Sequence, residues 1–121
     1  MPHEFRIDSQ MGLLEETYTG MISLDILNES NAAIIAHPDF RKGLKILTDL
    51  RHAQIPFGYQ VMSTHVRSQP SLHFSKQAFI VTGKREYGMI RMFQMLAENG
   101  EAFEETEVFE SIEEGIEWLT S

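Results

Sequence analysis

The sequence predicts an α/β protein with an open, mixed and mostly parallel sheet of about five strands covered by helices. Two observations carry this prediction. Segments 44–51 and 78–82 are short apolar runs with β-branched and aromatic residues, which are typical of strands. Each run leads into a segment whose apolar residues have helical spacing. Strand then helix, in succession, is typical of parallel strands joined by covering helices.

The N-terminal part adds a hairpin and a helix. Strand-like segments 5–8 and 13–19 flank short polar residues that end in Gly12, which predicts a hairpin at the antiparallel edge of the sheet. Ser23 is a suitable N-cap for a helix that ends at about residue 36. The buried stripe expected on this helix consists of Leu24, Leu27, Ile34 and Ile35.

The remaining elements complete the alternation. We expect one short helical turn over 37–43 that ends in a left-handed Gly43. A helix over about 59–66 follows the first parallel strand, and a second one over 86–99 follows segment 78–82. The last elements are a strand over 105–109 and a helix that begins with the capping-box residues Ser111 and Glu114.

Composition and length restrict the function. The chain has 121 residues, 42% of them hydrophobic and 23% charged, so we expect one globular domain over 1–121. A net charge of −8 argues against extended nucleic-acid contact. The absence of cysteine excludes disulfides and thiolate metal sites. No signal peptide or spanning apolar run is visible, so we expect a cytoplasmic protein without an integral membrane segment.

Three stretches carry a resemblance to a known family. They are Asp49-Leu50-Arg51 at the end of the central strand, residues 88–98 in the long helix, and Glu107-Val108-Phe109 before the last helix. With them the chain resembles small STAS-like (SpoIIAA-like) proteins over nearly its whole length. The resemblance implies an interaction module of bacterial regulation, and a neighbouring lipid-carrier group suggests apolar ligands. The family's phosphorylatable serine has no counterpart here, because 52–59 contains no Ser or Thr.

A polar rim is expected where the two parallel strands end, since functional groups collect at the carboxyl ends of such strands. Its members are Asp49, Arg51, His52, Lys84 and Arg85. They form a candidate site for an anion or another ligand next to a helix N-terminus. A nucleotide phosphate loop is not supported, because Ala78 and Arg85 break its pattern. The alternative is structural: Asp49 caps a backbone group or pairs with a nearby arginine, and Lys84 and Arg85 are solvated loop charges.

The methionine-rich helix over 86–99 is the other candidate. Met89, Phe93 and Leu96 fit core packing. The residues left over for an interface or an apolar pocket, together with two from the preceding helix, are Tyr59, Met62, Tyr87, Met92 and Met95.

Catalytic and metal signatures are missing from the sequence. The five histidines have no metal-ligand spacing, and no Ser-His-Asp pattern occurs, so we expect no cofactor. The sequence favours a non-enzymatic STAS-like regulatory or protein-interaction domain that forms a homodimer or binds a protein partner. The alternative is a protein that binds a small apolar molecule or lipid. An enzyme that uses the polar rim is the weakest hypothesis.

Overall fold

The computed structural model describes residues 2–56, 74–84, 86–88, 90, 91, 94 and 103–121. Its strands are β1 (His3–Asp8), β2 (Leu13–Met21), β3 (Lys45–Gln54), β4 (Phe74–Ile80) and β5 (Phe103–Phe109). Its helices are α1 (Leu24–Ala36) and α4 (Ile112–Leu119). The described residues between 84 and 94 are also helical, as the sequence predicts. No helix in these parts of the chain is long and apolar enough to cross a membrane.

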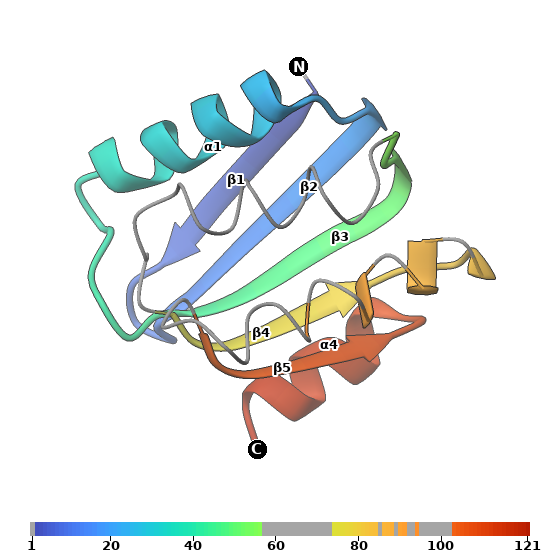
Figure 1. Cartoon of the computed structure of the whole chain (residues 1–121). Helices are drawn as coiled ribbons and strands as arrows, with labels where there is room; N and C mark the ends of the chain where they lie inside the picture. The colour runs from blue at the N-terminus through green and yellow to red at the C-terminus, as the bar shows by residue number, and fades with distance from the viewer. Residues whose placement is uncertain (1, 57–73, 85, 89, 92–93, 95–102) are drawn as a thin grey trace.

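The five strands form one sheet in the order β1-β2-β3-β4-β5 (Figure 1). β1 and β2 make the predicted antiparallel hairpin, and all other neighbours run parallel. The decisive pair is β3 with β4, in which Lys45 lies opposite Lys76 and Asp49 lies opposite Ile80. The prediction of an open, mixed, mostly parallel sheet is confirmed.

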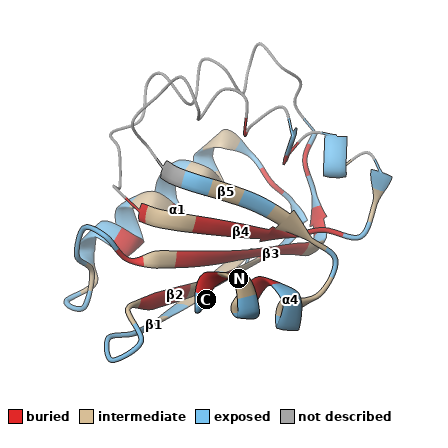
Figure 2. Ribbon diagram, turned by 90° about the horizontal axis from the view of Figure 1, so that it is seen from below, coloured by how far each residue is buried: buried red, intermediate tan, exposed pale blue. Residues whose placement is uncertain are grey.

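Helices cover both faces of the sheet (Figure 2). On one face, α1 packs over Tyr18, Leu50 and Phe79, together with Ile90 from the helical segment that follows β4. On the opposite face, α4 packs over Leu47 and the neighbouring residues of β4. We call these the α1 face and the α4 face. Because side chains alternate along a strand, adjacent residues of β3 belong to different faces.

The sequence of α1 explains its position. Ser23 caps the helix, since its Oγ accepts a hydrogen bond of 3.1 Å from the Ile26 amide. Ser30 and Ile34 are its buried residues, and Leu27 is partly buried against the core. The prediction for Ile35 was wrong, because that side chain is 47% exposed. Ile35 is turned by about 100° from Ile34, away from the face that packs on the sheet.

The bounds of several elements differ from the prediction, and β3 extends to Gln54 beyond the predicted end at residue 51. β4 begins at Phe74, before the predicted start at residue 78, and ends at Ile80 before Val81 and Thr82. Its first part was missed because Ser75, Lys76 and Gln77 are polar and do not form the apolar run that predicts a strand. The segment 37–43 forms turns instead of a helical turn, although Gly43 has the expected left-handed φ of +91°.

α4 begins with the predicted capping box and approaches the sheet closely. The Glu114 amide donates to Ser111 Oγ at 3.2 Å, and this hydroxyl donates to the Glu114 carboxylate at 3.1 Å. Gly115 is buried against the sheet, and a Cβ there would lie 2.8 Å from Ile80 Cδ1 and 3.2 Å from Leu47 Cδ1. A larger residue at position 115 would push α4 away from the core.

We therefore expect Gly115→Val to lower the free energy of unfolding by about 1–3 kcal/mol, because it overpacks the contact between α4 and the sheet. Urea unfolding measures this change. Glu117→Val is the matched control, since Glu117 is exposed on the same helix and its replacement should change stability by less than about 0.5 kcal/mol. Equal effects of the two substitutions would contradict the close packing of α4.

Candidate functional site

A hollow lies at the carboxyl ends of β3 and β4, where the sequence predicts a polar rim. Its volume is about 290 Å³. The lining residues are Leu50, Arg51, His52, Ala53, Gln54, Thr82, Gly83 and Glu86. β3 supplies one wall, and the residues that lead from β4 into the next helix supply the other. The parallel pairing of β3 with β4 creates this site, because it places both strand ends at one edge of the sheet.

An ion pair between Asp49 and Arg51 lies within β3, next to the residues that line the hollow. The Arg51 guanidinium donates two hydrogen bonds to the Asp49 carboxylate, Nε to Oδ1 at 3.0 Å and Nη2 to Oδ2 at 2.9 Å. The Arg51 amide also donates to Oδ1 at 3.1 Å. The register between β2 and β3 shifts here, since Thr17 pairs with Asp49 and Thr19 pairs with His52.

The pair is ionised over a wide pH range. Burial alone would raise the pKa of Asp49, but the hydrogen bonds and the charge of Arg51 outweigh burial and lower that pKa below its ordinary value. The charge of His52 lowers it further. The hydrogen bonds to Asp49 raise the pKa of Arg51 despite its partial desolvation, and Glu113 on α4 adds to the rise.

The structure brings together part of the predicted rim. Arg51 and His52 line the hollow, and Asp49 lies buried beside them on the α4 face. Lys84 is exposed at the start of the next helix and is not among the residues that line the hollow. Arg85 lies outside the described residues. The interpretation of Asp49 as a structural residue that pairs with a nearby arginine matches the observed geometry, because its carboxylate binds Arg51.

The helix N-terminus at the hollow already has an acidic side chain over it. Gly83 begins this helix, since its carbonyl accepts a hydrogen bond of 2.9 Å from the Tyr87 amide. The Glu86 carboxylate folds back over Gly83, where a Cβ would clash with it. An acidic residue in this position stabilises the helix dipole from within the chain. An added anion would have to share this place with Glu86.

The predicted apolar site is described only at one residue. Tyr87 is 48% exposed and follows Glu86, which lines the hollow. Tyr59, Met62, Met92 and Met95 lie outside the described residues, as do the expected core residues Met89 and Phe93.

A buried row of hydrogen bonds on the α1 face was not predicted. It starts in β1, where His3 Nε2 lies 2.8 Å from Glu16 Oε1. Glu16 Oε2 accepts a 2.7 Å hydrogen bond from the Thr48 hydroxyl, and Thr48 Oγ1 accepts one of 2.9 Å from Gln77 Nε2. Glu16, Thr48 and Gln77 are each no more than 5% exposed. The row therefore links the side chains of four neighbouring strands inside the core.

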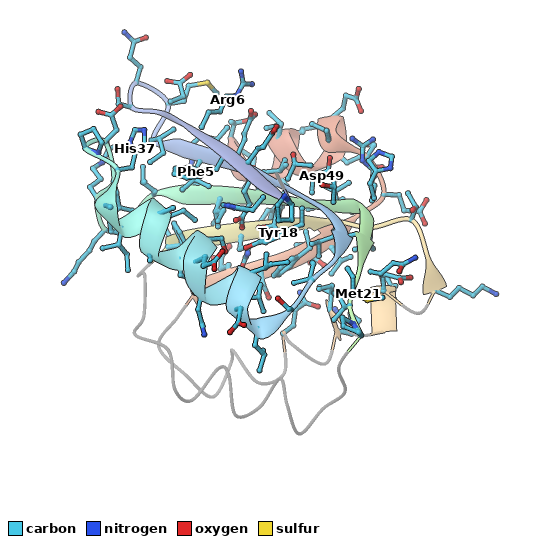
Figure 3. The ribbon with its side chains drawn as sticks, turned by 90° about the horizontal axis from the view of Figure 1, so that it is seen from above. Phe5, Arg6, Tyr18, Met21, His37 and Asp49 are labelled. Atoms are coloured by element: carbon cyan, nitrogen blue, oxygen red, sulfur yellow. The ribbon has the colours of Figure 1, made fainter. Side chains whose placement is uncertain are left out.

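Further polar groups extend this row. The hydroxyl groups of Tyr18 and Ser30 of α1 share a hydrogen bond of 2.6 Å. Figure 3 shows Tyr18 on the α1 side of the sheet and Asp49 on the side of α4. Burial and the charge of Glu16 raise the pKa of Tyr18 strongly, so its hydroxyl stays protonated. Gln77 Oε1 is the one buried side-chain polar atom without a hydrogen-bond partner in the described part of the chain.

A sequence signal for the row existed. Glu16 lies between Leu14 and Tyr18 at strand spacing, and Thr48 lies between Ile46 and Leu50 in the same way. A polar residue between two apolar residues of the same strand face must find a partner inside the protein. The sequence alone could not show which strands are neighbours, and so could not pair Glu16 with Thr48.

No group of acidic or histidine side chains in the described residues could hold a metal ion. No family model matches the sequence, and no curated protein matches it. The structure is similar to the crystal structure of an uncharacterised protein from Shewanella loihica PV-4, of the DUF3478 family and with a SpoIIAA-like fold. The TM-score is 0.61 at 13% identity, over 97% of this chain and 93% of the other.

The fold is SpoIIAA-like. The architecture expected from the resemblance is thereby confirmed, and at this low identity the likeness concerns the fold alone. The five-stranded sheet of this SpoIIAA-like chain has its hollow at the carboxyl ends of two parallel strands.

The Asp49–Arg51 pair predicts a pH-dependent contribution to stability. Because the pKa of Asp49 is lowered on folding, its contribution is complete above the unfolded value of about 3.9 and is lost as the pH falls through the folded value. We expect Asp49→Asn to destabilise by about 1–2 kcal/mol at pH 7, since Arg51 is partly exposed to solvent.

Urea unfolding between pH 7 and pH 2 measures this contribution. The difference between wild type and Asp49→Asn should shrink below about pH 4. Asp39→Asn is the control, because Asp39 is exposed in a turn and its loss should change little at any pH. A difference that stayed constant down to pH 2 would contradict an ionised, paired Asp49.

The buried row predicts a large cost for an isosteric substitution. Thr48→Val leaves Glu16 Oε2 and Gln77 Nε2 without the hydroxyl that joins them, so we expect a loss of about 2–4 kcal/mol. Thr17→Val, a half-buried position of β2 on the opposite face, should cost less than about 1 kcal/mol. Thermal and urea unfolding compare the two, and a Thr48→Val protein as stable as Thr17→Val would contradict the row.

Proposed function

We propose that this chain is a non-enzymatic regulatory or protein-interaction domain that self-associates. The observation that carries the proposal is the Asp49–Arg51 pair beside the strand-end hollow. The position is the one at which α/β proteins bind ligands and partners, yet its most deeply buried acid is committed to an internal ion pair. Such a site is suited to recognition more than to proton transfer.

The protonation states at the site support this distinction. A general acid or base works best when its pKa lies near the operating pH. The pKa of Asp49 is lowered and that of Arg51 is raised, so both groups move away from neutrality. The buried Tyr18 on the other face is shifted upward as well. Of the described groups with a shifted pKa, none moves toward a value useful for catalysis.

Exposed apolar side chains near the hollow support a binding role. Met21, at the end of β2, is 58% exposed and pairs in the sheet with Gln54, which lines the hollow. Tyr87, which is 48% exposed, follows Glu86 in the chain, and Glu86 lines the other wall. Methionine and tyrosine are enriched at protein interfaces. These two residues offer a partner apolar contact around a polar centre.

Sedimentation velocity over a range of concentrations tests the proposal, with native mass spectrometry as a second readout. We expect a concentration-dependent species of twice the 13.9 kDa chain mass. Extra mass from a co-purified molecule would support the alternative, an apolar-ligand or lipid-binding protein. A strictly monomeric and ligand-free chain would contradict the proposed self-association.

A further inference from the structure

We propose that two copies of this chain associate through the free edge of β1, which pairs antiparallel with β1 of the second copy about a two-fold axis at Phe5. This inference rests on the proposed self-association and names the surface that produces it. It leaves the strand-end hollow open, since no residue of β1 lines that hollow. A dimer formed through β1 therefore keeps the hollow of each chain free for a partner.

β1 is the first strand of the sheet and has β2 as its only neighbour in the described structure. The Thr19 amide donates to the Pro2 carbonyl at 2.9 Å, so Pro2 and Thr19 form a hydrogen-bonded pair next to the pair of His3 with Tyr18. Every second residue of an antiparallel strand belongs to such a pair. Glu4 and Arg6 therefore also direct their backbone groups to β2. The backbone groups of His3, Phe5 and Ile7 consequently point away from the sheet, where another strand can receive them.

The charges on β1 select the register. Glu4 is exposed, and the Arg6 side chain is 81% exposed, on the face opposite to α1. An axis at Phe5 places Glu4 opposite the partner's Arg6 and, by symmetry, Arg6 opposite the partner's Glu4. An axis at Glu4 or at Arg6 would instead place identical charges against each other. Opposite charges on facing strands stabilise the pairing, and like charges oppose it.

The apolar side of β1 fits the same register. Phe5 and Ile7 are only half-buried and pack at the margin of the core around Leu14 and Ile34. The Phe5 ring lies between two imidazoles, with centroids 5.6 Å from both His3 and His37, as Figure 3 shows for Phe5 and His37. Pairing about Phe5 brings the two phenylalanines side by side and covers their exposed parts. Aromatic cross-strand pairs stabilise sheets.

The opposite edge of the sheet is less suitable. β5 presents Glu105 and Glu107, which are both exposed, so two copies of β5 would set glutamates against glutamates. Pairing of β1 with β5 of another copy would be head-to-tail and would continue into open assemblies unless the rotation closed a ring. Self-pairing of β1 gives a closed dimer.

The test compares two variants whose β1 strands carry charges of opposite sign. Glu4→Arg gives β1 two positive residues, and Arg6→Glu gives it two negative ones. We expect each variant alone to dimerise at least about tenfold more weakly than wild type, because both cross-strand pairs become repulsive. A one-to-one mixture should regain association, since every pair is again attractive. Sedimentation velocity with one variant fluorescently labelled measures the mixed species.

Controls separate charge from folding. Glu29→Arg makes the same charge change at an exposed position of α1 and should leave dimerisation unchanged. Urea unfolding of each variant detects any loss of stability, which matters for Arg6→Glu because Arg6 also binds Glu15 within the chain. A folded Arg6→Glu chain that fails alone and associates with Glu4→Arg supports the inference.

The outcomes distinguish this inference from the proposed function. A wild-type chain that is monomeric at all concentrations contradicts both. A wild-type dimer that is unaffected by Glu4→Arg and Arg6→Glu keeps the proposed function and overturns the β1 edge. Sensitivity to Arg6→Glu alone, without recovery in the mixture, overturns the axis at Phe5.

Discussion

Two adjacent polar residues in the middle of the sheet, Thr48 and Asp49, set the main constraint on this fold. They are buried, and they face opposite sides of β3. Each must find its partners on its own face, because an unpaired buried polar group is costly. Thr48 does so with Glu16 and Gln77 of the neighbouring strands, and Asp49 does so with Arg51. A slip of one residue in β3 would separate Thr48 from Glu16 and Gln77 and would turn the Asp49–Arg51 pair to the other face of the sheet. The contacts of Thr48 therefore help to fix the register.

The same constraint relates the fold to its function. Parallel pairing of β3 and β4 forms the hollow, and Arg51, which lines it, is paired with the buried Asp49. Because that pair is satisfied internally, the edge of the sheet offers shape and apolar contact more than reactive groups. Met21 and Tyr87, which are exposed, are neighbours of the lining residues Gln54 in the sheet and Glu86 in the chain. This arrangement supports the regulatory or interaction role that we propose.

The sequence predicted the architecture well and the polar contacts poorly. Runs of apolar residues with strand or helical spacing reveal elements, and capping residues such as Ser23 and Ser111 mark where helices begin. Both caps were predicted and both are present. Gln77 shows the limit, because a strand with internally paired polar residues does not look like a strand. Pairings between distant strands, such as Glu16 with Thr48, depend on sheet order, which local patterns do not contain. Of the predicted rim, Arg51 and His52 line the hollow, and the choice of Arg51 as the partner of Asp49 became evident only from the geometry.

The most direct test of this account is the protonation of Asp49, followed by the carboxyl carbon chemical shift in an NMR titration of the folded protein, with Asp49→Asn used to assign the resonance. The account predicts that Asp49 stays ionised down to below its ordinary pKa of about 3.9, because Arg51 binds its carboxylate. A carboxyl that instead titrated near neutral pH would contradict the account. It would show an acid available for proton transfer at the edge of the sheet, and the site would then have to be regarded as catalytic.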